Sequence, residues 1–278
     1  MDFEKYNIKN LSLFGLTATC FDEQDLARCL CDAIRTGEQL VCFGYSLTLL
    51  PRFRVMPQIY KIAESCEIMV SDGKGFYHFC KLFGLPLRSD WAVYEVSDKL
   101  LDLAEHNGFS VLLLGSDMES NRLATDNLRG TYPNAKILEG HHGYFKEEDE
   151  AKVVEQINAL NPDVLLIGIS SPKKEEFVWR NRSRLKTKII VLMGGVIDIY
   201  AGKTKPIPPV VKKLCLTWLY RFVQEPRRTR HILFNGLNVI FRLIPALAWA
   251  RWIKKDKTFS IPAFYGVSVT GGCAESRE

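Results

Sequence analysis

The chain has 278 residues, of which 47% are hydrophobic and 25% are charged, so it can bury a core and is not a disordered or low-complexity protein. Its net charge of +5 conceals an asymmetry, because the segment from Lys203 to Lys257 holds thirteen Lys or Arg and only two acidic residues. A basic C-terminal segment on an acidic remainder predicts an anionic partner: membrane lipid, nucleic acid or a phosphorylated substrate.

The cysteines and the N-terminus indicate a cytosolic body. The eight cysteines are scattered and several fall in apolar patterns, which favours buried thiols in a reducing compartment over metal ligands. The first residues contain no basic-then-apolar signal segment, and no run of about 20 apolar residues occurs.

Short apolar runs alternate with helical patterns through most of the chain, after 21 residues that show no clear pattern. The predicted strands are 40–43, 67–71, 110–114, 135–138, 164–169 and 188–193. The predicted helices are 22–35, 51–65 (weaker), 97–107, 118–129, 147–160 and one that begins near 172. This alternation predicts an α/β fold with a Rossmann-like parallel sheet, helices on both faces, and function at the strand ends.

The stretch from Asp163 to Trp179 carries the clearest signal. It reads as a buried strand followed at once by a helix with Ser171 as N-cap and Pro172 at the first helical position. A strand that runs into a helix presents backbone N–H groups where nucleotide phosphates bind in open α/β folds.

Two lysines fall in the first turn of that predicted helix, where the helix dipole disfavours cations. A bound anion would explain Lys173 and Lys174. The alternative is that Glu175 and Glu176 neutralise them on a solvated surface. The residues alone leave both explanations open.

Other polar residues follow predicted strands. Asp72 precedes Gly-Lys-Gly, so it is either a general base at the sheet edge or part of an Asp-Gly turn, and spacing favours the turn. His141-His142 fits a loop role better than a metal site, since no carboxylate or cysteine lies at metal spacing beside it. Gly194-Gly195 permits close backbone approach, and Asp198 could cap a helix or bind a ligand hydroxyl. No Asp-x-Asp, Gly-x-Gly-x-x-Gly or P-loop pattern occurs, so no metal ligand is predicted.

After residue 204 the alternation stops. Residues 205–209 form a proline-rich linker, 210–223 a predicted helix, and a second helix is predicted from Pro226 to Pro245, with 246–253 continuing. Apolar and aromatic residues on one side and Lys/Arg on the other fit an interfacial helix pair on a membrane. The alternatives are packing against the body or an oligomer interface. We therefore expect an α/β domain (1–204), a basic amphipathic helical appendage that associates with a membrane (205–257) and a flexible tail (258–278).

Several of these motifs, in this order, resemble the WecG/TagA/CpsF glycosyltransferases over roughly residues 40 to 235. The most specific is Trp218-Leu-Tyr-Arg-Phe-Val-Gln-Glu-Pro-Arg-Arg228. The others are Asp72-Gly, Leu113-Leu-Gly115, Gly140-His-His-Gly-Tyr-Phe145, Pro162-Asp163, Gly168-x-Ser-Ser-Pro-Lys-Lys-Glu175 and Gly194-Gly-x-x-Asp198 with Ala201-Gly-Lys203.

The resemblance implies a metal-independent inverting hexosyltransferase without a cofactor. It would move a sugar from a UDP-sugar to a polyprenyl-diphosphate-linked saccharide in bacterial surface or exopolysaccharide synthesis. It would lie peripherally on the cytoplasmic face of the cell membrane, and family members can be homo-oligomers. Asp72 matches the general base, and Arg221 and Arg228 match arginines that approach the leaving diphosphate. The donor pocket is expected to use Tyr144, Gly168, Ser171, Lys174, Glu175, Gly194, Gly195 and Asp198.

The chain departs from the family pattern at several places. Lys174 replaces a glutamine, Gly44-Tyr-Ser46 replaces a Thr-x-Asn element, Arg88 to Glu95 keeps an Arg-Val-Thr-Gly-x-Asp-Leu motif only faintly, and Pro206-Ile-Pro208 replaces Arg-Ala-Pro. These changes put the sugar in doubt, so a catalytically degenerate nucleotide-sugar-binding or assembly protein is the alternative. Nucleic-acid binding is not expected, because the basic residues are interleaved with long aliphatic runs.

Overall fold

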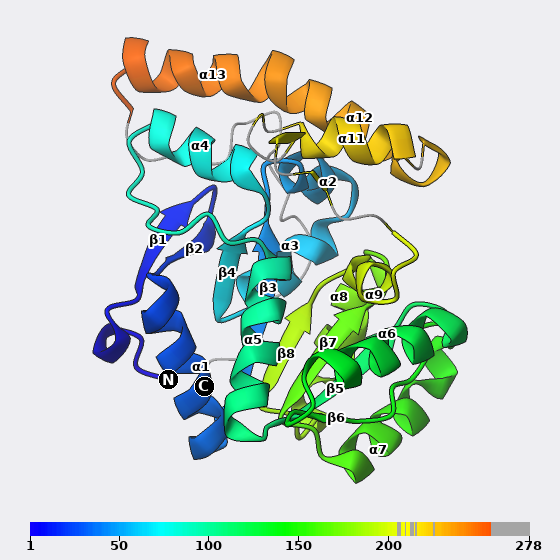
Figure 1. The fold of residues 1–278 in the computed structure, drawn as a ribbon. Helices are drawn as coiled ribbons and strands as arrows, with labels where there is room; N and C mark the ends of the chain where they lie inside the picture. The colour runs from blue at the N-terminus through cyan, green and yellow to red at the C-terminus, as the bar shows by residue number, and fades with distance from the viewer. Residues whose placement is uncertain (205–206, 209, 212–213, 215, 225, 257–278) are drawn as a thin grey trace, which may run out of the picture.

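Six parallel strands form the central sheet of the structure, a computed structural model that describes residues 1–204, 207–208, 210–211, 214, 216–224 and 226–256 (Figure 1). The strands are arranged in the order β4-β3-β8-β7-β5-β6, and every neighbouring pair is parallel. Their bounds are β3 (Leu40–Tyr45), β4 (Ile68–Ser71), β5 (Ser110–Gly115), β6 (Lys136–Ile137), β7 (Val164–Gly168) and β8 (Ile189–Leu192). The predicted Rossmann-like α/β fold is confirmed.

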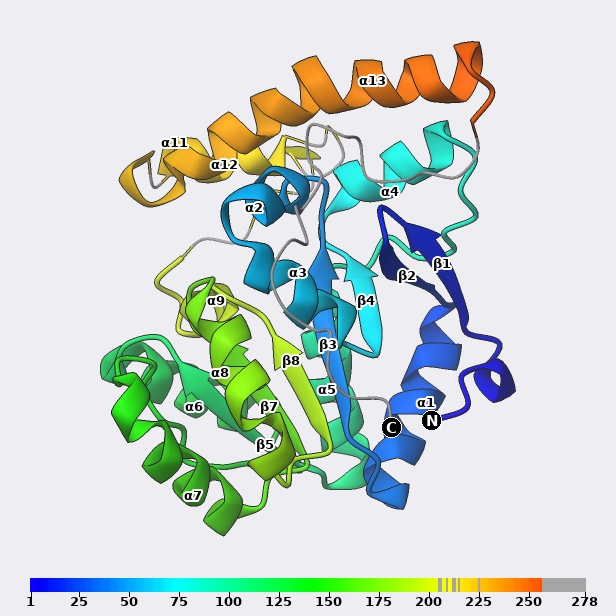
Figure 2. The ribbon, with the colours of Figure 1, turned by 180° about the vertical axis from the view of Figure 1, so that it is seen from behind.

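Helices cover both faces of this sheet, and each face has its own cluster of buried apolar side chains. One face carries α1 (Glu23–Thr36), α5 (Val93–Asn107), α6 (Met118–Thr131) and α9 (Val196–Tyr200), as Figure 1 shows. The other carries α2 (Leu49–Val55), α3 (Pro57–Glu64), α4 (Lys74–Leu82), α7 (Glu150–Leu160) and α8 (Lys173–Asn181), several of which face the viewer in Figure 2. Because the sheet is covered twice, β7 and β8 are buried at every residue, which explains their uninterrupted apolar sequences.

Two elements differ from the predicted ones for local reasons. The weak helix predicted at 51–65 is two helices, separated at Met56 before Pro57, because the residue before a proline is pushed out of the helical region. The helix predicted from 97 begins four residues earlier, at Val93, where the Glu95 side chain accepts a hydrogen bond from the Ala92 N–H.

The first 21 residues, which show no clear sequence pattern, form a hairpin of β1 (Lys9–Leu13) and β2 (Leu16–Cys20) after a short 3-10 turn, η1 (Glu4–Tyr6). The turn residue Phe14 is fully buried with a positive φ of 54°. The Tyr45 hydroxyl donates to Leu13 O, and Met69 N donates to Thr19 Oγ1, so the hairpin is fixed against β3 and β4.

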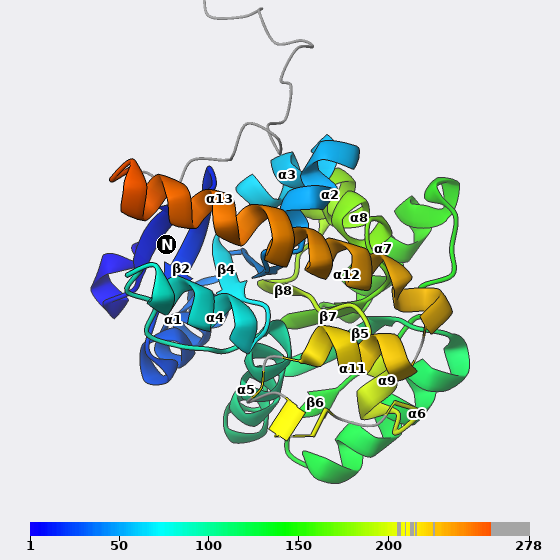
Figure 3. The same ribbon diagram turned by 90° about the horizontal axis from the view of Figure 1, so that it is seen from above.

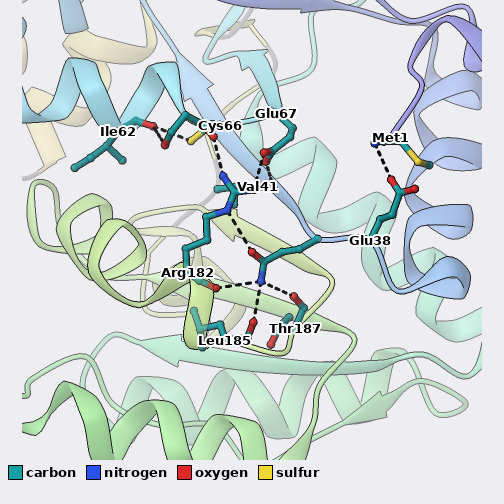
Figure 4. Close-up of polar contacts among 11 residues, drawn as sticks. Met1, Glu38, Val41, Ile62, Cys66, Glu67, Arg182, Leu185 and Thr187 are labelled. Atoms are coloured by element: carbon teal, nitrogen blue, oxygen red, sulfur yellow. Dashed lines mark hydrogen bonds and ion pairs between the residues drawn. The ribbon is translucent and has the colours of Figure 1, made fainter. Parts of the chain in front are cut away.

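The amino edge of the sheet is closed by a polar network around Arg182 (Figure 4). Arg182 donates to Gln39 Oε1, Ser65 O and Glu67 Oε1, the last at 2.6 Å. Glu67 in turn accepts from the Val41 N–H, and Gln39 donates to three backbone carbonyls ahead of β8. Since these groups satisfy one another, this edge offers few free polar groups to a ligand.

The C-terminal segment is helical almost to its described end. α11 (Thr217–Gln224) packs against α12 (Pro226–Asn238), and the latter continues without interruption through η4 (Val239–Leu243), α13 (Ile244–Ala248) and η5 (Trp249–Ile253). The predicted stop at Pro245 is wrong. Pro245 directly follows the π-helical η4, and such a π-helical segment is one way in which a helix accommodates a residue without an N–H donor.

This long helix has two apolar sides. Val239, Leu243 and Leu247 are buried in the body's core, and the Trp252 ring stacks on Phe83 with the centroids 5.4 Å apart. The opposite side leaves large apolar side chains exposed, among them Phe241 at 73% and Trp249 at 58%. Leu233–Ile253 is also the one described helix that is long and apolar enough to cross a membrane; it has 21 residues, and an 18-residue window within it has a mean hydropathy of 1.4. Residues 258–278, Cys215 and much of the linker at 205–209 lie outside the described residues.

Candidate functional site

The carboxyl edge of the sheet gathers residues that are far apart in the sequence. Because all six strands are parallel, Gly44 at the end of β3, Asp72 after β4, Ser116 after β5, Gly168 at the end of β7 and Gly194 after β8 come to the same edge. Figure 3 shows this edge from above, with α11 and α12 lying over it. The sequence predicted this grouping from the alternation of strands and helices.

Asp72 occupies the strand-to-helix turn between β4 and α4, and its side chain is exposed. Its N–H donates to Tyr45 O at 2.8 Å, and Gly73 follows with a φ of 101°. A Cβ on Gly44 would lie 2.7 Å from Val93 Cγ2 and 3.2 Å from Asp72 Cβ. The two sequence interpretations are therefore compatible: Asp72-Gly73 makes the turn, and the turn leaves the carboxylate at the edge.

Glycines pack the backbones of three loops together on the other half of the edge. A Cβ on Gly115, whose φ is 122°, would lie 2.6 Å from the Gly168 carbonyl carbon. A Cβ on Gly143 would lie 3.1 Å from Gly115 Cα, and one on Gly168 would lie 2.4 Å from Ile197 Cδ1. A larger residue is excluded at Gly115 by backbone contact, and at Gly143 and Gly168 mainly by the side chains of Ile169 and Ile197.

The buried amide of Asn121 joins the same loops. Its Nδ2 donates to Leu113 O at 3.0 Å, to Gly115 O at 2.7 Å and to His141 O at 3.1 Å. Gly140 lies so close to this side chain that a Cβ would overlap Asn121 Oδ1. The sequence pattern does not indicate Asn121, since a lone asparagine within a helix carries no recognisable signal.

Asp198 lies in the first turn of α9 and is half-buried. Its carboxylate accepts a short hydrogen bond from Ser116 Oγ, and no cap bond from a side chain is made at Gly195, the residue ahead of the helix. The Asp198 carbonyl accepts from the N–H groups of Lys203 and Thr204. The Asp198 carboxylate thus connects α9 to the end of β5, next to the glycine contacts. Gly195, which precedes α9, is exposed.

Tyr144 is 77% exposed, in the loop that follows β6. Its N–H donates to His142 Nδ1, and the pKa of His142 is lowered by burial and by the neighbouring His141 and Lys173 charges. Lys173 Nζ donates to Gly143 O and Phe145 O and lies over the Phe145 ring. The lysine holds this loop in place, which agrees with a loop role for the histidines.

Both lysines at the start of α8 therefore have partners within the protein. Lys174 Nζ donates to Leu192 O at 3.3 Å and lies 3.8 Å from Glu175 Oε1. Glu175 is only 2% exposed, and its Oε2 has no hydrogen-bond partner among the described residues. Carbonyl groups and one buried carboxylate balance these cations, and Glu176 takes no part in the ion pair.

The predicted helix start at Ser171 is wrong by one residue. α8 begins at Lys173 with Pro172 as its N-cap residue, and no side-chain cap is made. The Ser171 hydroxyl instead accepts a hydrogen bond from Arg52 on α2, at 2.9 Å. No sequence signal pointed to Arg52, because its partner lies 119 residues away.

The remaining predicted residues are Arg221 on α11 and Arg228 on α12. Both helices lie over the carboxyl edge (Figures 1 and 3), but the two side chains lie outside what the structure describes. Within the described part of the chain, no group of three His, Cys, Asp or Glu side chains is placed to hold a metal ion.

Comparison with known families places the chain. Residues 11–255 match the Glycosyl transferase WecG/TagA/CpsF family. The chain belongs to this family. Among curated relatives, two proteins of Staphylococcus aureus (strains MRSA252 and MW2) are named N-acetylglucosaminyldiphosphoundecaprenol N-acetyl-beta-D-mannosaminyltransferase. Each is 30% identical over 168 residues, which cover 60% of this chain and 65% of the relative's length. The expected WecG/TagA/CpsF resemblance is confirmed.

Proposed function

We propose that this protein is a hexosyltransferase that moves a sugar from a UDP-sugar to a lipid-diphosphate-linked saccharide during bacterial surface or exopolysaccharide synthesis. Family membership carries the proposal, and relatives of the same family are named for transfer to a diphosphoundecaprenol-linked sugar. The gathering of Asp72, Gly168, Gly194 and Asp198 at one sheet edge supports it.

In this proposal Asp72 is the general base. Its exposed carboxylate would take the proton of an acceptor hydroxyl as the oxygen attacks the anomeric carbon of the donor. The new C–O bond forms on one side of the sugar while the bond to the UDP oxygen breaks on the other. The configuration at the anomeric carbon is inverted in this single displacement, and UDP leaves.

The donor would lie over the glycine contacts and the starts of α8 and α9. We assign to this site Gly168, Ser171, Lys174, Glu175, Gly194, Gly195, Asp198 and, on the exposed loop above, Tyr144. At Gly194 a Cβ would meet Lys174 Nζ only at 3.6 Å, so the backbone there is accessible to the diphosphate of a nucleotide. The unpartnered Oε2 of Glu175 marks a polar group with capacity to accept one more hydrogen bond.

The charge on the departing diphosphate would be stabilised by Arg221 and Arg228 and by backbone N–H groups, without a cofactor or a metal. Arginine suits this role because its planar guanidinium binds two phosphate oxygens at once. The two arginines belong to helices that lie over the carboxyl edge, which puts their backbones on the correct side of the sheet.

The appendage, residues 205–257, would rest on the cytoplasmic face of the membrane. Exposed Phe234, Phe241 and Trp249 and the basic composition of the segment fit an interfacial helix whose opposite side packs on the body. Val239, Leu243 and Leu247 form a stripe that is buried against the body, which favours a peripheral helix over one that spans the membrane. Self-association through the same apolar side would give a homo-oligomer when no membrane is present.

One observation favours a second candidate, a catalytically degenerate binding or assembly protein of the same pathway. In the altered element Gly44-Tyr-Ser46, the threonine and asparagine positions carry Gly44 and Ser46. Gly44 offers no side chain to a substrate, and the Ser46 hydroxyl is hydrogen-bonded to Thr48 Oγ1. The second candidate would bind a UDP-sugar but transfer nothing.

Calorimetry of UDP and a panel of UDP-sugars in EDTA tests the donor site. We expect one UDP-sugar to bind at micromolar concentration and Asp198→Ala to weaken it about tenfold, the loss of one charged hydrogen bond. Asp126→Ala, on the exposed side of α6, is the matched control and should bind as wild type does. Absence of binding by folded wild-type protein would overturn the transferase proposal. Binding without release of UDP to any lipid-diphosphate acceptor would select the second candidate.

A further inference from the structure

We propose that Arg52 binds the diphosphate group of the lipid-linked acceptor at the rim between α2 and the turn that precedes α8. This inference rests on the proposed function and adds to it a residue that neither the sequence motifs nor the relatives point to. Its starting observation is the set of contacts that Arg52 makes, and those that it does not make.

Arginines in the body of this protein are used in ion pairs. Among those up to residue 204 whose side chains the structure describes, all form an ion pair with Asp or Glu except Arg52 and Arg184. The paired ones are Arg28, Arg35, Arg88, Arg122, Arg129, Arg180 and Arg182. Arg184 precedes β8, at the amino edge, and its guanidinium bonds the Asn181 side chain. Arg52 is therefore the one described, unpaired arginine of the body at the carboxyl edge.

The guanidinium of Arg52 is partly buried and only lightly used. Its Nη2 donates to Ser171 Oγ at 2.9 Å, which is its one polar contact among the described residues. A guanidinium carries five N–H donors in a fixed fork, so most of its hydrogen-bonding capacity is unspent. A half-buried cation without a counter-ion is unfavourable unless an anion completes it. The fork matches the paired oxygens of a phosphate.

Arg52 lies where the two assigned sites meet, because its partner Ser171 belongs to the donor site whereas α2 follows β3. We assign the unused N–H groups of its fork to the acceptor for the following reasons. α2 follows β3, on the half of the edge that holds Asp72, whereas the residues assigned to the donor come mainly from β6, β7 and β8. α2 also contacts α12, and its last residue, Val55, is 77% exposed. Figure 3 shows α2 beside the long C-terminal helix. A polyprenyl chain bound along that helix would carry its diphosphate towards the same edge of the sheet.

Equilibrium binding of two soluble probes, farnesyl diphosphate and UDP, tests this without requiring turnover. We expect Arg52→Gln to weaken farnesyl diphosphate about tenfold or more, since a hydrogen bond to a charged group contributes roughly 1.5–3 kcal/mol, and to change UDP affinity less than about twofold. Arg52→Lys should fall between, because it keeps the charge and loses the fork. Arg184→Gln is the matched control and should bind both probes as wild type does.

Each outcome decides something. Unchanged affinity of Arg52→Gln for farnesyl diphosphate would show a purely structural arginine and overturn the inference, while the transferase proposal stands. An equal loss for UDP would assign Arg52 to the nucleotide and overturn it as well. If the wild-type protein binds UDP but not farnesyl diphosphate, the inference about the acceptor site is rejected and the proposed function stands. If it binds neither probe, the proposed function is rejected too. Equal melting temperatures of the variants exclude unfolding as the cause of a loss.

Discussion

The two halves of the carboxyl edge are built differently. On the glycine-packed half (Gly115, Gly140, Gly143 and Gly168), backbones touch one another and Asn121 bonds three carbonyls. On the open half (the ends of β3 and β4), side chains of Val93 and Asp72 fill the space around Gly44. On the glycine-packed half, packing restricts the residue types that fit, whatever ligand binds there. On the open half, side chains can be exchanged without moving the backbone. Two departures from the family pattern, at 44–46 and 88–95, belong to the open half, and Lys174 belongs to the other.

The largest expected effect is a loss of catalytic rate on substitution of Asp72, which belongs to the open half. Asp72→Asn should lower the rate of transfer by roughly 10²–10⁴, the usual contribution of a general base, with the free energy of unfolding nearly unchanged because the side chain is exposed. Initial rates of UDP release and a denaturant melt measure the two quantities. UDP affinity should stay the same, since the residue lies on the open half. A variant that keeps full activity would remove Asp72 from the mechanism.

A pair of glycine substitutions sharpens the comparison. Gly115→Ala should cost about 3 kcal/mol of stability, because its Cβ would meet the Gly168 backbone and its φ of 122° suits glycine alone. Gly44→Ala should cost less, about 2 kcal/mol, since its Cβ would meet the side chains of Val93 and Asp72 and not a backbone, but it should lower kcat by displacing Asp72. Urea melts and initial rates on both variants test this. Equal stability losses would mean that the two halves are not built differently.

Asn121→Ala probes the glycine-packed half through its side chain. Leu113 O and His141 O keep backbone donors, so the loss falls mainly on Gly115 O and on the cavity, about 2 kcal/mol in all. Chemical denaturation gives the value. Asn127→Ala on the same helix, whose amide bonds Tyr200 O at an exposed position, should cost about 0.5 kcal/mol. A mild effect at Asn121 would show that the glycines alone hold the loops.

The smallest effect concerns the cap of α6. The Ser120 N–H and hydroxyl lower the pKa of Asp117 from 3.8 to about 2. A lowered pKa in the folded state adds stability that is complete above pH 3.8 and is lost as the pH falls towards 2. Asp117→Ala should therefore cost about 1 kcal/mol near pH 7, a cap value discounted for a half-exposed carboxylate, and less near pH 3. Melts at both pH values check the trend, which a constant difference would contradict.

The strands and the edge they share were predictable because a sheet covered on both faces requires uninterrupted apolar runs, as at Val164 to Gly168. Asp72 and Asp198 follow such runs, so their place at the edge was predictable too. Short-range patterns could not find what depends on distant partners. Examples are the hydrogen bond from Arg52 to Ser171, the hydrogen bonds from Lys173 to the carbonyls of Gly143 and Phe145, and the continuation of the helix through Pro245.

The N-terminal hairpin escaped prediction because its two strands are short and joined at Phe14-Gly15, where a non-glycine residue adopts a positive φ. The glycine contacts, by contrast, follow from residue type once the strands are placed, because glycine alone allows backbones to meet so closely.

The same hairpin affects how copies of the protein can meet. A sheet's outer strands normally offer unpaired N–H and C=O groups that recruit another chain and seed aggregation. Here Thr19 takes the Met69 N–H of β4 at one end, and the other end is the two-residue β6, too short to template a partner. The central sheet is thus blunted at both ends, which disfavours its extension from one molecule into the next.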